Sequence, residues 1–331
     1  MHAIIPVAGA GTKLRPHTHT LPKPLIPVAG KPILGYIVES LAEAGVQDFT
    51  FVIGYLGSKI RAYIEENFKD RIRYTFIRQE NRMGIGHALH LCQANVLDGQ
   101  PLLIALGDAI IDADLQELLA RPENLVCVQR VDDPRKFGVA QLNDEGQVTE
   151  LVEKPAIPKS NLALVGLYRL QDSRPLFDAI DYLLERQQTT LGEFQLTDAL
   201  QYMVTQGVVI KTFPVKRWFD CGDKDALLET NRILLDRQTE APVLSFPGSI
   251  VVPPVSIAPN CVIEHSIIGP YVAIAEHSVI RNSILEDTIL GAYTTLDSII
   301  LRRSVVGNDS TLKGRSQAVS IGDNTEIDFN S

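Results

Sequence analysis

A repeat of branched aliphatic residues beyond position 250 constrains the fold of this chain more than any other feature. Eleven such residues follow one another at spacings of five or six: Ile257, Ile263, Ile268, Ile274, Ile280, Leu285, Leu290, Leu296, Leu301, Val306 and Leu312. A second small or branched residue stands four positions after several of them, as at Ile267 and Ile284. This period matches one flat side of a triangular parallel β-helix, whose coils stack their aliphatic residues on one another. At three positions per coil, the eleven residues predict between three and four coils.

The first two thirds of the chain have a different hydrophobic pattern, in which short apolar runs alternate with helical patterns. The apolar runs cover residues 3–7, 49–53, 72–77, 102–106 and 125–129, and residues 32–44 are an example of the helical patterns. Such alternation predicts a doubly wound, mostly parallel α/β sheet. Because ligands on these sheets bind at the carboxyl ends of strands, we expect the site in the loops after Val7 and Leu106.

This change of hydrophobic pattern predicts two domains, and a length of 331 residues is sufficient for both. A last helix is expected over residues 224–237, and the segment 238–248 behind it contains two prolines and a glycine, as linkers do. We therefore assign residues 1–240 to the α/β domain and residues 241–331 to the β-helix.

The charge balance narrows the choice of partners. Lys and Arg total 31 against 40 Asp and Glu, and the net charge of −9 gives no general attraction to nucleic acid or to an anionic membrane. The four cysteines lie far apart, and no stretch approaches the roughly 20 apolar residues of a membrane span. We expect a cytoplasmic protein in which any phosphate ligand is held by local groups.

The loop after the first apolar run reads Val7-Ala-Gly-Ala-Gly-Thr-Lys-Leu-Arg-Pro16, and its glycines allow close approach of the backbone to a phosphate. A dinucleotide-binding fingerprint needs a third glycine at Leu14, and a P-loop needs Gly-Lys-Ser/Thr, so both motifs are incomplete. The stretch Pro22-Lys-Pro24 follows. Together the two segments resemble the signature of sugar-1-phosphate nucleotidylyltransferases, Gly-x-Gly-Thr-Arg-Leu-x-Pro followed by Pro-Lys-Pro.

The resemblance extends over essentially the whole chain and is to the long form of glucose-1-phosphate thymidylyltransferase, which carries a C-terminal left-handed β-helix. It implies a Rossmann-like nucleotidyltransferase domain followed by a hexapeptide-like β-helix. Two pieces, residues 5–9 and 195–198, equally resemble bacterial UDP-glucose pyrophosphorylase. The nucleotide-binding residues implied in the first loop are Ala8, Gly9, Gly11 and Thr12.

By the same resemblance, Gln79 and Gly84 read the pyrimidine edge, and Asp108 and Asp220 hold Mg²⁺ between the reacting phosphates. A glutamine amide offers both a donor and an acceptor, which suits the N3–H and O4 of thymine or uracil. Mg²⁺ requires hard oxygen ligands and leaves coordination positions for the substrates. Each aspartate by itself is also compatible with a helix cap or a turn.

The sugar-binding half is implied in three later segments. Gly138 and Glu153 would bind sugar hydroxyls, and Lys154 would fix the sugar phosphate, since an ammonium group neutralises the repulsion between the two phosphates. Tyr168 and Glu193 complete the implied sugar-phosphate set.

The resemblance therefore implies Mg²⁺-dependent transfer of a nucleotidyl group from a pyrimidine nucleoside triphosphate, dTTP rather than UTP, to a sugar 1-phosphate such as glucose 1-phosphate. Lys23 would contact phosphate and Lys13 the leaving pyrophosphate, making Lys13, Lys23, Asp108 and Lys154 the catalytic set. Lys13 stands where the family has arginine, and Arg and Lys are not equivalent at a bidentate phosphate site. A UTP-dependent uridylyltransferase and a non-catalytic regulatory subunit remain alternatives. We expect a homo-oligomer, assembled through the β-helix.

Overall fold

The computed structural model describes residues 1–238 and 245–314. The chain forms two compact units, Met1–Thr230 and Asn231–Ser331. The domain boundary predicted between residues 240 and 241 lies outside the described residues. Within the described ranges, no helix is both long and apolar enough to cross a membrane.

A nine-stranded sheet forms the centre of the first unit, in the order β10-β9-β11-β6-β1-β4-β5, with β8 beside β11 and β12 beside β8. Its strands are β1 (His2–Val7), β4 (Asp48–Ile53), β5 (Arg73–Arg78), β6 (Leu102–Ala105), β8 (Asn124–Arg130), β9 (Gly138–Leu142), β10 (Val148–Glu153), β11 (Leu162–Leu170) and β12 (Ile210–Pro214). The five predicted apolar runs became β1, β4, β5, β6 and β8, with ends that differ by one residue at most. β1, β4, β5 and β6 run parallel, whereas β11 runs antiparallel to β6 and β8.

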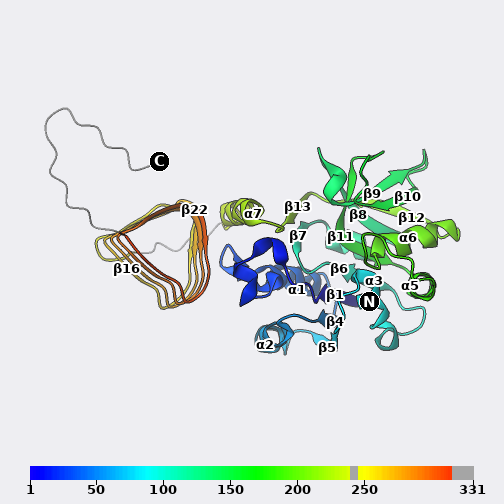
Figure 1. Ribbon diagram of the computed structural model, residues 1–331, viewed down its shortest axis with the longest axis horizontal. Helices are drawn as coiled ribbons and strands as arrows, with labels where there is room; N and C mark the ends of the chain where they lie inside the picture. The colour runs from blue at the N-terminus through cyan, green and yellow to red at the C-terminus, as the bar shows by residue number, and fades with distance from the viewer. Residues whose placement is uncertain (239–244, 315–331) are drawn as a thin grey trace. The chain divides into compact units, whose positions relative to one another are not determined.

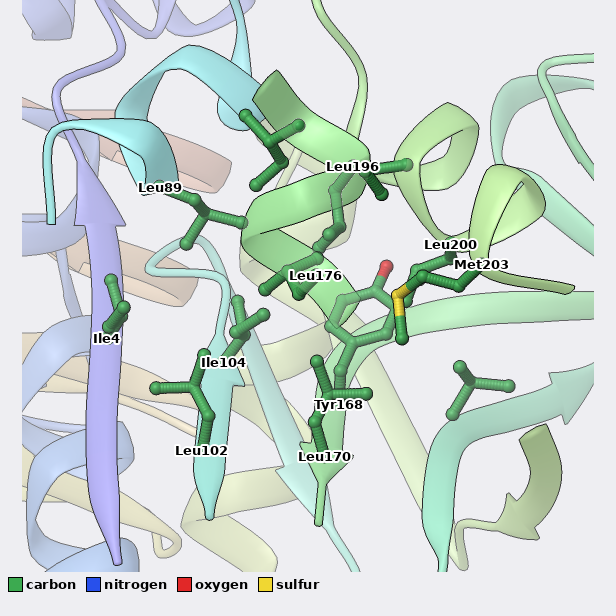
Figure 2. Packing of buried hydrophobic residues seen from close by; sticks show 14 of the residues in the cluster. Ile4, Leu89, Leu102, Ile104, Tyr168, Leu170, Leu176, Leu196, Leu200 and Met203 are labelled. Atoms are coloured by element: carbon green, nitrogen blue, oxygen red, sulfur yellow. The ribbon is translucent and has the colours of Figure 1, made fainter. Parts of the chain in front are cut away.

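Helices cover both faces of this sheet (Figure 1), as the alternation of apolar runs predicts. The helices of the chain are α1 (Ile33–Glu43), α2 (Gly57–Phe68), α3 (Ile85–His90), α4 (Leu115–Ala120), α5 (Arg174–Glu185), α6 (Leu196–Thr205) and α7 (Lys224–Asp236), which follows β13 and is not part of this cover. Figure 2 shows Ile4 and Ile104 of the sheet facing Leu89 of α3, Leu176 of α5 and Leu196 of α6 in one buried cluster. Since side chains alternate along a strand, the neighbours of Ile4 point to the other face.

The strand order reverses at β1, because the chain passes from β1 to β4 and β5 on one side and then returns to β6 on the other. The loops after β1 and β6 meet there, because a side chain at Gly107 would collide with Val7. Ligands of open α/β sheets bind at this kind of topological switch point. The two loops in which the sequence analysis predicts the site therefore meet at this switch point.

Two short pairs of strands complete the first unit. They are β2 (Pro27–Val28) with β3 (Lys31–Pro32), and β7 (Ala109–Asp112) with β13 (Arg217–Asp220).

The second unit is a parallel β-helix, and Figure 1 shows its coils superposed in a triangular outline. Its strands are β14 (Ile250–Val251), β15 (Val255–Ile257), β16 (Val262–Glu264), β17 (Ile267–Ile268), β18 (Val272–Ile274), β19 (Val279–Arg281), β20 (Ile284–Leu290), β21 (Thr295–Asp297), β22 (Ile300–Val306) and β23 (Thr311–Lys313). Strands of successive coils pair in parallel and in register, for example β16-β19-β21-β23. Seven residues of the predicted repeat are buried in the core of this unit, and the other four, Ile257, Leu301, Val306 and Leu312, are partly buried and pack against it.

The coils turn at residues with left-handed backbone conformations that recur at the same corner of successive coils. One corner uses Asn260, His277, Tyr293 and Asp309, and another uses His265, Asn282 and Ser298. The structure thus confirms the doubly wound sheet followed by a parallel β-helix. The handedness of the β-helix stays a prediction.

Candidate active site

A hydrogen bond from one buried threonine fixes the loop after β1. Gly11 has φ +60°, and its carbonyl accepts a hydrogen bond of 2.8 Å from Thr18 Oγ1. A Cβ on Gly11 would lie 2.9 Å from Thr18 Cγ2, so no side chain fits. Gly9 is exposed, with nothing within 4 Å of the place where its Cβ would be. A phosphate can therefore approach the backbone of this loop closely.

Ala8 takes the place of the glycine that opens the family's loop, and the structure shows how its methyl group is accommodated. Ala8 is buried, and Gly54 lies directly against it after β4. A Cβ on Gly54 would come within 2.9 Å of Ala8 Cβ. The methyl group thus fills space that Gly54 leaves empty.

Two aspartates that are far apart in the sequence lie together beside this loop. Asp108 directly precedes β7, and Asp220 ends β13, whose register with β7 pairs Asp220 with Ala109. Lys23 Nζ lies 2.9 Å from Asp108 Oδ2, and its side chain is only 12% exposed. Burial raises the pKa of the Asp220 carboxyl; Lys23 and Lys13 oppose this shift, and Asp108 adds to it.

The donor set of this cluster fits Mg²⁺. Across the described residues, no group of three or more His, Cys, Asp or Glu could hold a metal ion by itself. Mg²⁺ is commonly bound by one or two carboxylates together with water and substrate phosphates, whereas zinc sites need three or four protein ligands. The raised pKa of Asp220 indicates a carboxylate whose negative charge is only partly compensated, so a cation beside it is favourable.

Lys13 lies on the short helix Thr12–Leu14, and both Lys13 and Thr12 are exposed. The Lys13 ammonium acts on the pKa of Asp220, which places its charge in the same cluster. Lys13 and Lys23, which the sequence analysis assigns to phosphate contact, therefore lie beside the two aspartates.

The segment predicted to read the base lies at the end of β5, on the β4 side of the loop after β1, which is the predicted phosphate loop (residues 8–16). Gln79 is 6% exposed, and its Nε2 donates to the carbonyl of Gly84 at 3.1 Å. The same nitrogen lies 3.0 Å from Nδ1 of His87, a residue that the sequence analysis did not single out. Gly84 has φ +100°, and a Cβ there would lie 2.5 Å from the carbonyl oxygen of Phe194.

The predicted sugar segment lies on β9 and β10, on the opposite side of the phosphate loop. Glu153 ends β10, and its Oε2 accepts a hydrogen bond of 2.7 Å from Thr197 Oγ1 of α6. A Cβ on Gly138 would lie 3.1 Å from both of these oxygen atoms. A side chain at Gly138 would therefore crowd this hydrogen bond and Leu164.

Lys154 Nζ lies 3.4 Å from Glu153 Oε1, and its side chain is 46% exposed. Its φ of +42° is a left-handed conformation that costs a non-glycine residue about 1 kcal/mol or more. A hydrogen bond of 3.0 Å from Lys154 N to Phe137 O holds this conformation. The ring of Phe137 packs edge-on against Trp218, two residues before Asp220.

The remaining two predicted residues are Tyr168 and Glu193, and the charges of Glu153 and Asp108 act on the Tyr168 hydroxyl. Tyr168 is only 4% exposed and lies in the core cluster, where burial raises the pKa of its hydroxyl (Figure 2). Glu193 is exposed, and its Cβ lies 2.9 Å from where Gly84 would carry one. The structure thus brings Glu193 to the base segment.

Sequence reasoning missed four residues that shape the site: Thr18, Gly54, His87 and Thr197. Each acts through a partner distant in the sequence or through a side-chain contact that no local motif specifies. Thr197 had the clearest signal, because it lies in the segment 195–198 that matched the uridylyl branch of the family.

Comparison with known proteins identifies the family of this chain. The family model described as nucleotidyl transferase matches residues 2–237. The chain is 31% identical to the low-salt glycan biosynthesis nucleotidyltransferase Agl11 of Haloferax volcanii, over 95% of this chain and 100% of that protein. It is 32% identical to a glucose-1-phosphate thymidylyltransferase of Streptomyces griseus, over 88% and 87% of the two chains.

The fold matches the crystal structure of a UDP-glucose pyrophosphorylase complexed with UDP-glucose, with a TM-score of 0.62 and 24% identity over 72% of this chain and 99% of that chain. The family match covers the sheet that carries the phosphate loop, both aspartates and the base and sugar segments. The chain therefore belongs to the nucleotidyl transferase family of enzymes.

Proposed function

We propose that the protein transfers a nucleotidyl group from a pyrimidine nucleoside triphosphate to a sugar 1-phosphate and releases pyrophosphate. The observation that carries this proposal is the cluster of Lys23, Asp108 and Asp220 at the switch point, between a base segment and a sugar segment. The nucleoside triphosphate and the sugar 1-phosphate would lie end to end across the sheet, with the base at the base segment, the phosphates at the cluster and the sugar at the sugar segment.

The reaction is a direct displacement. A phosphate oxygen of the sugar 1-phosphate forms a bond to the α-phosphorus, and the bond from the α-phosphorus to the bridging oxygen of the β-phosphate breaks. Such transfers depend mainly on positioning and charge neutralisation, so a site of aspartates, lysines and backbone amides needs no covalent nucleophile.

The residues divide these tasks. Lys154 holds the attacking sugar phosphate, with Glu153 and the Gly138 backbone on the sugar hydroxyls. Lys23 contacts the triphosphate, and Lys13, exposed at the loop, neutralises charge that develops on pyrophosphate. Asp108 and Asp220 would hold Mg²⁺, which when bound supplies a Lewis acid for the phosphate oxygens.

We favour dTTP and glucose 1-phosphate as the substrates. The similarity to a glucose-1-phosphate thymidylyltransferase, over 88% of this chain and 87% of that protein, supports this choice. UTP is the alternative, because the segment 195–198 and Ala8 are shared with the uridylyl branch. We further propose that the β-helix assembles the protein into a homo-oligomer.

A pyrophosphate-release assay with dTTP, UTP, CTP and ATP, each combined with several sugar 1-phosphates, tests the function. We expect Mg²⁺-dependent release with a pyrimidine triphosphate and a hexose 1-phosphate. If no pair gives turnover, the proposed activity is wrong, and the non-catalytic regulatory subunit becomes the preferred alternative.

A further inference from the structure

Gln79 has its amide orientation fixed by the backbone of its own loop. The carbonyl of Gly84 can only accept hydrogen bonds, so the amide atom that faces it at 3.1 Å must be the nitrogen. The same carbonyl also accepts from Ala88 N at 3.2 Å. A flipped amide would place two oxygen atoms against each other.

The loop that carries this carbonyl is itself clamped. Gly86 N donates to Phe194 O at 2.7 Å, and Phe194 N donates to Met83 O at 2.8 Å. No residue other than glycine fits position 84, where a Cβ would meet the Phe194 backbone. The acceptor for Gln79 therefore has a fixed position.

His87 takes the second hydrogen of the same amide. Its Nδ1 lies 3.0 Å from Gln79 Nε2, and two N–H groups cannot face each other, so Nδ1 must be unprotonated and the ring proton must lie on Nε2. Burial, with a smaller effect from His90, lowers the pKa of His87 and so favours this neutral form.

Both hydrogens of the Gln79 amide are thus used inside the protein. Oε1 accepts no hydrogen bond from the part of the chain that the structure describes. The sequence analysis expected the amide to offer the base a donor and an acceptor, but only the acceptor is free.

We propose that His87 is a positioning residue that makes Gln79 an acceptor-only reader of the base and thereby selects a ring N–H. Thymine and uracil present such a group at N3. Cytosine presents a lone pair at N3, which would face the lone pairs of Oε1. The inference rests on the proposed function, because it assumes that Gln79 faces a pyrimidine.

The test compares His87→Leu, which removes the acceptor at similar size, with His87→Asn, whose Oδ1 can replace Nδ1. His90→Leu is the matched control, because His90 lies on the same helix but contacts Asp181. We expect His87→Leu to lower the ratio of kcat/KM for dTTP or UTP to that for CTP about tenfold, mainly through KM, because one amide hydrogen loses its partner. His87→Asn should restore most of the ratio, and His90→Leu should leave it unchanged.

An unchanged ratio in His87→Leu, with wild-type turnover as proposed, would overturn the inference. A wild-type protein that uses no pyrimidine triphosphate would instead overturn the proposed function. Nitrogen-15 NMR of the histidine rings in the unmodified protein gives an answer that needs no folded variant. The Nε2–H tautomer is expected for His87, and a proton on Nδ1 at neutral pH would refute the positioning role.

Discussion

Replacing Thr197 by valine tests the geometry of the sugar pocket most directly. Thr197 Oγ1 donates to Glu153 Oε2 at 2.7 Å, and the Glu153 side chain is only 12% exposed. Valine keeps the shape of threonine but leaves one carboxylate oxygen without its donor, where water has little access. Hydrogen bonds to charged groups contribute about 1.5–3 kcal/mol, so we expect a loss of about 2 kcal/mol in the free energy of unfolding.

This loss should be visible in the melting temperature. With an unfolding entropy of about 2.1 cal/mol/K per residue, a unit spanning residues 1–230 melts about 4 °C lower for each 2 kcal/mol lost. The KM for the sugar phosphate should rise about tenfold, equivalent to about 1.4 kcal/mol, because the freed carboxylate turns away from the sugar hydroxyls. The KM for the triphosphate should stay near that of the wild type.

Differential scanning calorimetry and steady-state kinetics with one substrate held saturating measure the two effects. Thr197→Ser is the control, because it keeps the hydroxyl and should retain the sugar KM. A valine variant with the melting temperature and the sugar KM of the wild type would refute the assignment of Glu153 to the sugar.

Three further outcomes are expected. Asp220→Asn should lose Mg²⁺-dependent turnover. In EDTA at neutral pH the variant should nevertheless melt at a higher temperature than the wild type, and a lower melting temperature would contradict the expected effect of the Asp220 charge. The raised pKa of Asp220 means that ionisation disfavours the fold, so this gain should vanish below the unfolded pKa of about 4 and grow as pH rises through the folded value. Lys13→Ala should lower turnover roughly a hundredfold, about 3 kcal/mol, with less effect on triphosphate affinity, and Lys13→Arg should stay active; wild-type turnover in the alanine variant would make Lys13 a solvated loop residue. Ending the chain near residue 240 should change the number of subunits seen by sedimentation, and an unchanged number would exclude assembly through the β-helix.

The amino-acid sequence by itself determined the class of both units and the elements with the strongest apolar pattern, because that signal is periodic and local. The aliphatic repeat from Ile257 to Leu312 predicts eleven residues that form or contact the core of the β-helix, which also contains Val255 and Val272. The apolar runs placed five strands of the sheet to within one residue. Backbone propensity and side-chain period act over a few residues, so a short window of sequence contains the whole signal.

The tertiary structure alone decided how the candidate site residues combine. Asp108 and Asp220 are adjacent because β13 pairs with β7, and no pattern near either residue specifies that pairing. Thr197 was placed against Glu153 by the packing of α6 on the sheet, and His87 was turned toward Gln79 by the loop that Phe194 clamps. These contacts depend on side-chain orientation and on the closure of long loops. No local sequence pattern encodes either of these, because both result from the packing of the whole fold.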